Sequence, residues 1–180
     1  IVRNQAQTDI LKEIGAKYIC DSSSDDFKAQ LYNAINETGA TLAFDAIGGG
    51  ELVSDILTAM EQVGSKDAKG FNTYGSDANK QVYIYGGLDF SPSTLNRAYG
   101  MTWGIGGWLL NRFLAKITPQ RIGELQKQVA DGIKTTFACT FTEELSFEQA
   151  MTPSVIAQYN AKKTGAKFLI NPSKDWSHNL

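Results

Sequence analysis

The sequence predicts an α/β protein built on a doubly wound parallel sheet, and two observations carry this prediction. Residues 40–47 and 81–87 are near-continuous apolar runs, each ending in or followed by glycines. Such runs are typical of strands that are buried on both faces of a parallel sheet. The expected elements also alternate between strand and helix, which indicates crossovers between parallel strands. In open sheets of this kind, ligands bind at the carboxyl ends of the strands.

The first half of the chain follows this alternation from its first residue. The expected elements are, in order, a strand over 1–3, a helix over 5–14, a strand over 17–20, a helix over 27–36, a strand over 40–47, a helix over 51–63 and a strand over 81–85. Apolar residues three or four positions apart give each helix one apolar face. Gly15 and Gly39 follow the first two helices as C-terminal caps.

The pattern changes beyond Gly87. A Pro/Ser loop and a segment rich in glycine and tryptophan come first. Helices over 119–133 and 154–163 and strands over 135–141 and 167–170 are expected after them. The chain is therefore interpreted as two parts, residues 1–115 and residues 116–180.

Composition excludes several classes of function. The 17 basic and 19 acidic residues are interspersed and give a net charge of −2, so no basic stripe favours nucleic acid. No apolar run approaches the roughly 20 residues needed to span a bilayer, so no membrane partner is expected. Cys20 and Cys139 are interpreted as two buried thiols of a cytoplasmic protein. No metal site is expected, because His178 is the only histidine and lies next to the chain end.

Five short motifs, in this order and spacing, resemble the cofactor domain and C-terminal tail of medium-chain dehydrogenase/reductases. More narrowly, they are similar to the zinc-independent quinone oxidoreductase-like branch. Together they extend over roughly nine-tenths of the chain. The motifs are Ile-Val-Arg-Asn (1–4), Leu-Lys-Glu-Ile-Gly-Ala-Lys (11–17), Phe-Asp-Ala-Ile-Gly-Gly (44–49), Tyr-Ile-Tyr-Gly-Gly-Leu (83–88) and Trp-Gly-Ile-Gly-Gly-Trp-Leu (103–109).

The resemblance implies a partial Rossmann-like domain. In the family, a first strand and a Gly-rich phosphate turn precede the strand that ends here at Arg3, and an N-terminal substrate domain precedes both. This chain is accordingly expected to be a fragment that is inactive alone. Its tail, residues 116–180, is expected to return to the substrate domain and to stay out of the cofactor domain's sheet. The family strand order 3-2-1-4-5-6 would leave a gap where the first strand belongs.

NADPH is the implied cofactor, because a cation lies where the second strand ends. Arg3 would accommodate the 2′-phosphate of NADP, and Asn4 and Gln7 would add donors. Arg3 could instead be a solvated residue at a helix start. Ser22 falls at an adenosine-side contact of this branch, with a helix N-cap as the alternative.

Three further segments are implied to contact the cofactor. Asp45, Ala46, Ile47 and Gly48 would lie under the nicotinamide ribose, although Asp45 could instead cap the following helix. Tyr85, Gly86 and Gly87 would lie against the nicotinamide, and a plain turn is the alternative. Trp103, Gly104 and Ile105 would hydrogen-bond the carboxamide, or this segment could pack at a subunit interface.

The resemblance implies zinc-free hydride transfer from NADPH to a quinone, enone or similar conjugated carbonyl. Enoyl-thioester reduction and non-enzymatic NADPH binding are the alternatives. The expected partners are a small-molecule substrate and a second copy, paired through Tyr99–Leu110, whose apolar side chains crowd one edge of the domain. No catalytic residue can be assigned from the sequence.

Overall fold

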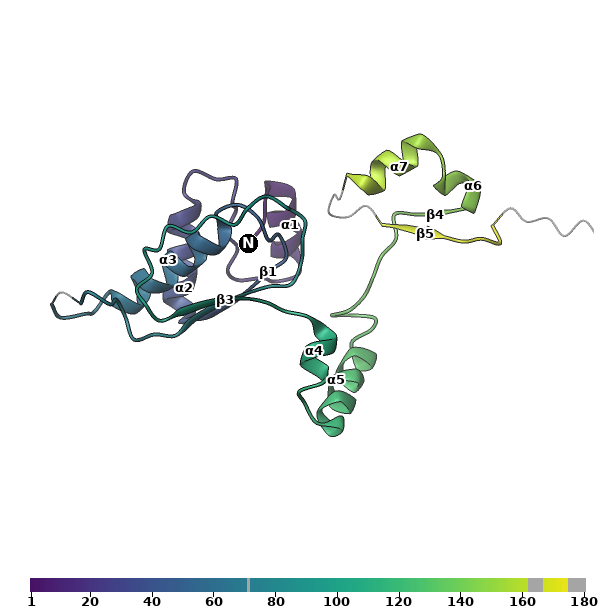
Figure 1. The fold of residues 1–180 in the computed structure, drawn as a ribbon. Coiled ribbons are helices and arrows are strands. Elements are labelled where there is room, and N and C mark those ends of the chain that lie inside the picture. The colour runs from purple at the N-terminus through teal and green to yellow at the C-terminus, as the bar shows by residue number, and fades with distance from the viewer. Residues whose placement is uncertain (71, 162–166, 175–180) are drawn as a thin grey trace, which may run out of the picture. The chain divides into compact units, whose positions relative to one another are not determined.

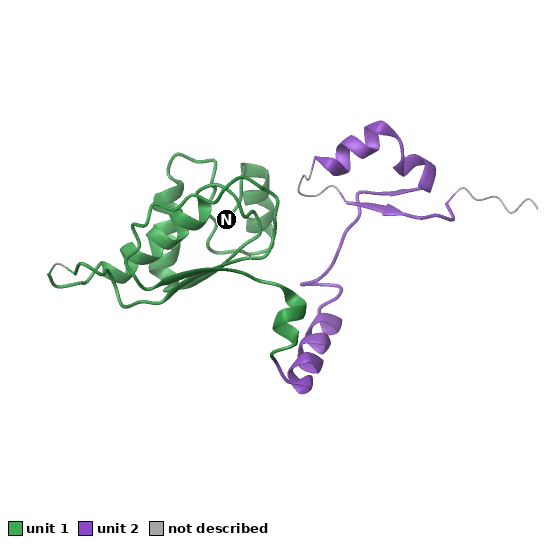
Figure 2. Cartoon of the chain, in the orientation of Figure 1, with its two compact units in different colours: residues 1–116 green, residues 117–180 purple. Residues whose placement is uncertain are grey.

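The computed structural model describes residues 1–70, 72–161 and 167–174 (Figure 1). The chain divides into two compact units, residues 1–116 and residues 117–180 (Figure 2). None of the helices in the described ranges is both long and apolar enough to cross a membrane. His178 lies outside the described residues.

Unit 1 contains a three-stranded parallel sheet in the order β1-β2-β3. Its elements are α1 (Gln5–Glu13), α2 (Phe27–Thr38), β1 (Leu42–Asp45), α3 (Leu52–Ser65), β2 (Lys80–Ile84), β3 (Trp103–Gly107) and α4 (Leu110–Leu114). In the register, Phe44 of β1 lies opposite Tyr83, and Ile84 of β2 lies opposite Gly107. The parallel α/β architecture predicted from the sequence is confirmed.

The ends of the first two helices follow their local sequence. Asn4 caps α1, because its side-chain oxygen accepts a hydrogen bond from the Gln7 amide at 3.0 Å. Gly39 ends α2 in the left-handed conformation, with φ 65°, which glycine adopts without steric cost.

No strand forms at residues 17–20, where the sequence predicted one. Only an isolated parallel bridge between Val2 and Asp21 is present. The Val2 amide donates to the Cys20 carbonyl at 2.8 Å, and the Ser22 amide donates to the Val2 carbonyl at 2.8 Å. The partner segment turns into α1 at its cap, Asn4, two residues after Val2. The pairing therefore does not continue past the bridge on that side.

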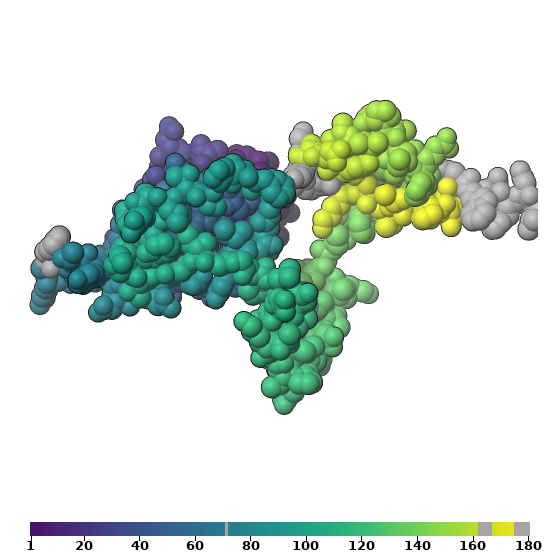
Figure 3. All heavy atoms as spheres, viewed as in Figure 1, coloured from purple at the N-terminus to yellow at the C-terminus, as the bar shows by residue number. Residues whose placement is uncertain are grey.

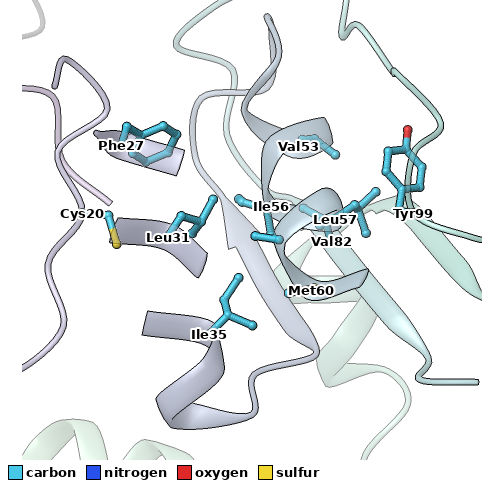
Figure 4. Packing of buried hydrophobic residues seen from close by; sticks show 11 residues of the cluster. Cys20, Phe27, Leu31, Ile35, Val53, Ile56, Leu57, Met60, Val82 and Tyr99 are labelled. Carbon is cyan, nitrogen blue, oxygen red and sulfur yellow. The ribbon is translucent and has the colours of Figure 1, made fainter. Parts of the chain in front are cut away.

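The core of unit 1 lies between α2, α3 and one face of the sheet (Figure 4). Leu57, Val82 and Tyr99 are fully buried in it. Side chains of β1 and β3, including Ala43 and Ile105, pack against the same cluster. The helices α2 and α3 supply the cover of that face. On the other face the side chains of Leu42 and Phe44 are about half exposed.

Unit 2 contains a separate two-stranded parallel sheet, β4-β5. Its elements are α5 (Pro119–Asp131), β4 (Glu143–Leu145), α6 (Phe147–Ala150), α7 (Pro153–Asn160) and β5 (Phe168–Ile170). The last predicted strand is confirmed as β5. As expected, neither strand joins β1–β3.

The prediction of a strand at residues 135–141 is wrong. Residues 132–137 form turns, because the Gly132 carbonyl accepts hydrogen bonds from the amides of both Thr135 and Phe137 at 3.0 Å. The strand begins only at Glu143. Cys139 is exposed in this segment, whereas Cys20 is buried, so the expectation of two buried thiols holds for Cys20 alone.

Candidate functional site

The carboxyl ends of β1, β2 and β3 meet at one edge of the sheet, as parallel pairing requires. The pairing continues one residue beyond β2 and β3. The Tyr85 amide donates to the Asp45 carbonyl at 2.9 Å, and the Trp108 amide donates to the Ile84 carbonyl at 2.8 Å. We call residues 45–48, 85–87 and 107–109 the carboxyl edge. Ligands of open α/β sheets bind at such an edge.

Asp45 is the acidic residue of the carboxyl edge, and its carboxylate is already engaged. One oxygen accepts from the Ile47 amide at 2.8 Å and the other from the Gly48 amide at 3.1 Å. The residue is only 3% exposed. Asp45 therefore holds its own turn together and does not cap α3, whose N-cap residue, Glu51, makes no side-chain cap bond. A cofactor ribose would have to share this carboxylate with two backbone amides.

Two glycines of the carboxyl edge are needed because two backbone turns touch there. A Cβ on Gly86 would collide with the Ala46 carbonyl oxygen and lie 2.9 Å from the Ala46 carbonyl carbon. A Cβ on Gly48, which has φ 94°, would lie 3.1 Å from the Gly86 oxygen. Gly48 and Gly86 thus allow turn-to-turn contact. Their presence does not depend on a ligand.

The loop that follows β2 covers the glycine run 48–50. The Asp89 amide donates to the Ile47 carbonyl at 2.9 Å, and the Ser93 hydroxyl donates to the Gly48 carbonyl at 2.6 Å. Gly50 and Ser93 also form a parallel bridge. The teal atoms that follow β2 make up much of the visible surface of unit 1 in Figure 3. The backbone groups of Gly48 and Gly50 are consequently satisfied by protein.

Aromatic side chains gather on the sheet face opposite the core. The Phe44 ring centroid lies 5.8 Å from Tyr83, 6.5 Å from Tyr85 and 6.1 Å from Trp108, and Phe113 of α4 lies 5.8 Å from Trp108. Phe44 and Tyr85 are each 54% exposed. We call Phe44, Tyr83, Tyr85 and Trp108 the aromatic face. It reaches the carboxyl edge through Tyr85 and Trp108.

The residues expected at the adenosine end lie around the Val2–Asp21 bridge. Arg3 is exposed, and its guanidinium pairs with no residue that the structure describes. Its backbone amide donates to the Gln7 side chain at 2.7 Å. The Ser22 hydroxyl donates to the Val2 carbonyl at 2.9 Å. Ser22 is not a helix N-cap, because Asp26 takes that position in α2. An exposed guanidinium of this kind can bind a phosphate group.

Trp103, Gly104 and Ile105 are not brought to the carboxyl edge. Trp103 opens β3 opposite Lys80, the first residue of β2, at the other end of the sheet. Its ring packs edge-on against Tyr99 at 4.9 Å, and its indole N–H donates to the Gly100 carbonyl at 3.1 Å. A Cβ on Gly104 would collide with the side-chain oxygen of Gln81. The contacts of this segment are those of a packed edge strand.

In this segment, Gly107 at the end of β3 and Trp108 and Leu109 after it reach the carboxyl edge, and sequence reasoning did not select Trp108 or Leu109. The signal lay in the repeated pattern, since Gly106-Gly107 ends β3 as Gly86-Gly87 follows β2. In the described ranges, no three or more His, Cys, Asp or Glu side chains gather in a group that could hold a metal ion.

Solved structures share this fold. A provisionally assigned NADPH:quinone reductase from Mesorhizobium loti superposes with a TM-score of 0.70 at 21% identity, over 95% of this chain and 44% of that chain. A provisionally assigned NADPH:quinone reductase from Bacillus thuringiensis gives 0.59 at 15% identity, over 92% and 44%. A mutant enoyl thioester reductase from Candida tropicalis gives 0.54 at 19% identity, over 94% and 45%.

The chain shares the α/β fold of these reductases over the part of each that it covers. The resemblance inferred from the five sequence motifs is thus confirmed at the level of fold. The chain spans less than half the length of the structures it matches. No protein-family model and no curated protein sequence matches it.

Proposed function

We propose that this chain is the cofactor-binding part of an NADPH-dependent oxidoreductase. Its substrate is a quinone, an enone or a similar conjugated carbonyl, reduced by hydride transfer without zinc. When bound, the cofactor supplies the hydride. The residues of this chain hold and orient it, and the acceptor pocket is contributed mainly by the rest of the parent polypeptide.

One observation carries the proposal. Three parallel strands end together at the carboxyl edge, in a fold that superposes on NADPH:quinone reductases over nearly the whole chain. The backbone of Tyr85–Gly87 and Gly107–Leu109 would lie along the nicotinamide end. Arg3, Asn4, Gln7 and Ser22 would face the adenosine end, with the Arg3 guanidinium on the 2′-phosphate. Ala46, Ile47 and Gly48 would approach the ribose through their backbone, while Asp45 keeps their turn in shape.

Enoyl-thioester reduction is the second candidate. It is favoured by the similarity to the Etr1p complex with NADP and crotonyl-CoA, with a TM-score of 0.55 at 19% identity. The two reactions share hydride delivery to a carbon conjugated with a carbonyl group, so the carboxyl edge does not separate them. A non-enzymatic NADPH-binding protein is the alternative outside catalysis.

We also propose a cytoplasmic homodimer that pairs through Tyr99–Leu110, with no nucleic-acid or membrane partner. The proposal is supported by the position of β3 at the end of the sheet order and by the exposed Met101, Leu109 and Leu110. An enoyl thioester reductase of the same fold, Etr1p/Etr2p, forms a heterodimer.

NADPH oxidation by the full-length parent tests the function. Turnover of a model quinone with little turnover of crotonyl-CoA would support the first candidate, and the reverse preference would support the second. NADPH binding without turnover of either compound would support the third alternative, a non-enzymatic NADPH-binding protein. A parent that neither binds nor oxidises NADPH would contradict all three.

A further inference from the structure

A carboxylate in the middle of α3 is fully coordinated inside unit 1. Glu61 is 8% exposed. One of its oxygens accepts from the Ser65 hydroxyl at 2.6 Å and the Ser76 amide at 2.7 Å. The other oxygen accepts from the Ser76 hydroxyl at 2.7 Å and the Lys80 ammonium at 2.7 Å. Each carboxylate oxygen therefore has two donors, which offsets the cost of burying the charge.

The partner cation is equally well satisfied. Lys80 is fully buried. Its ammonium also donates to the Ala78 carbonyl at 2.8 Å and the Ser76 hydroxyl at 3.1 Å, so all three N–H groups have acceptors. Buried polar networks in which every member is satisfied rigidify the elements they join. Here they join α3, the start of β2 and the turn at residues 72–76.

The turn at 72–76 in turn contacts the residues that lead into β3. Gly75 and Gly100 have φ values of 78° and 64° and lie back to back. A Cβ on Gly75 would lie 2.6 Å from the Gly100 Cα and 2.7 Å from a Glu61 oxygen. The Met101 amide donates to the Tyr74 carbonyl at 2.9 Å. Only glycine allows this close approach. The Glu61 carboxylate is in contact with both glycines, because a Cβ added to Gly100 would also lie 3.3 Å from a Glu61 oxygen.

β3 is an edge strand, held in the sheet on one side by β2. Its residues include Gly104, Gly106 and Gly107, which have no side chain to pack into the core. Its entry point is fixed by the Met101–Tyr74 hydrogen bond and by the Lys80 amide, which donates to the Thr102 carbonyl at 3.1 Å. Both contacts belong to segments that Glu61 holds.

We propose that Glu61 is a positioning residue for β3: by binding Ser76 and Lys80 it holds the 72–76 turn under Gly100 and so keeps the edge strand in register. This role lies outside the carboxyl edge, because Lys80 is the first residue of β2 and the network is therefore at the amino end of the sheet. It holds whether or not the parent polypeptide is a reductase.

Hydrogen–deuterium exchange of the 180-residue chain tests the proposal through Glu61→Gln, which keeps the shape of the side chain and removes its charge. We expect amide exchange in residues 100–107 to become about tenfold faster or more, a change that corresponds to the loss of one or two hydrogen bonds. Exchange in β1 and α2 should change much less. Asp55→Asn is the matched control, because Asp55 lies in the same helix and pairs with Lys28 at 3.0 Å, away from β3.

Unchanged exchange in residues 100–107 of Glu61→Gln would overturn the proposal. An equal rise in β1, α2 and β3 would also overturn it, because that result describes global destabilisation. Should Glu61→Gln fail to fold, Ser76→Ala removes a single hydroxyl from the network. It should accelerate exchange in the same residues by a smaller factor, and an unaltered pattern in Ser76→Ala would likewise contradict the role of Glu61.

Discussion

The ammonium group of Lys80 lies 2.7 Å from a carboxylate oxygen of Glu61, and both side chains are buried. Removing one partner of such a pair leaves an uncompensated charge in the interior. We therefore expect Lys80→Met to lower the free energy of unfolding by about 3–5 kcal/mol. Urea denaturation of the 180-residue chain measures this change.

The double variant Glu61→Leu with Lys80→Met removes both charges. Its decrease in the free energy of unfolding should be clearly smaller than the sum of the decreases in the two single variants. Lys28→Met is the control for an exposed pair. The Lys28 side chain is 74% exposed, so that substitution should cost only about 0.2–1 kcal/mol. A double variant whose decrease in unfolding free energy equals the sum for the Glu61 and Lys80 single variants would contradict the pairing.

Stability should also depend on pH through Glu61. Burial alone would raise the pKa of Glu61, but hydrogen bonds from Lys80, Ser65 and Ser76 lower it from 4.5 to about 2. Because the folded-state pKa is depressed, the stabilisation is complete above about pH 4.5 and is lost as the pH falls toward 2. The shift corresponds to about 3 kcal/mol.

Urea denaturation between pH 2 and pH 6 measures this loss. Exposed carboxyl groups with lowered pKa values, such as Asp89 and Glu124, add to the slope in both wild type and variant. The difference between wild type and Glu61→Gln isolates the contribution of Glu61. Parallel pH profiles for the two proteins would show that the carboxylate is not stabilised by its partners.

The contact between the two glycine turns can be tested by adding one methyl group. Gly86→Ala would place a Cβ against the Ala46 carbonyl, where only backbone could give way. We expect a loss of about 1–3 kcal/mol or more, as for overpacking. Gly107→Ala is a matched control at the same edge, because a Cβ added there would meet nothing within 4 Å. Equal stability of the two variants would contradict the close contact.

Much of unit 1 could be predicted because its signals are local. The apolar runs of β1 and β2, the helix cap at Asn4 and the glycine after α2 each act within a few residues. The strand at 17–20 could not be predicted correctly, because a ladder depends on its partner, and Val2 offers only one bridge. The strand at 135–141 failed for a similar reason, since the Gly132 carbonyl captures amides that a strand would present.

The position of the site at the carboxyl ends of the strands was predicted from the sequence. The residues that the β3 segment contributes to it were not predicted correctly. The glycines after β1 and β2 were identified, but their cause, contact between two turns, is a long-range fact that no local pattern contains. Trp103 was chosen from the β3 segment, although the sheet register puts Trp108 at the carboxyl edge. The Glu61–Lys80 pair joins two residues that are distant in the sequence, through a turn. Helical periodicity alone gives no reason to connect them.

Cofactor preference provides a test of Arg3. A pair of charge-assisted hydrogen bonds to the 2′-phosphate should favour NADP over NAD by about 2–4 kcal/mol in the intact parent protein. Arg3→Ala should remove most of this preference and leave NAD affinity nearly unchanged. Calorimetric titration of both cofactors measures it, with Lys12→Ala as a control cation in the helix that follows. A variant with the wild-type preference would make Arg3 a solvated surface residue.

Self-association is the last test, and the structure narrows the residues that can carry it. Tyr99 is fully buried and so is not available to a partner, and Trp103, which packs on it, is half-buried. Met101, Leu109 and Leu110 are 66%, 60% and 55% exposed beside an edge strand. Such an apolar edge favours pairing with a second copy across a two-fold axis. At roughly 25 cal/mol per Å², burial of several hundred Å² per subunit suffices for a stable pair before association costs.

Leu109→Asp should therefore weaken the dimer about tenfold or more, since a 1.4 kcal/mol loss already gives that factor. Ile14→Asp is the matched control, because Ile14 is 74% exposed as the C-cap residue of α1 and lies outside the proposed interface. Light scattering across micromolar concentrations compares the two variants with wild type. A wild-type chain that stays monomeric over this range, or variants that dissociate equally, would exclude pairing through Tyr99–Leu110.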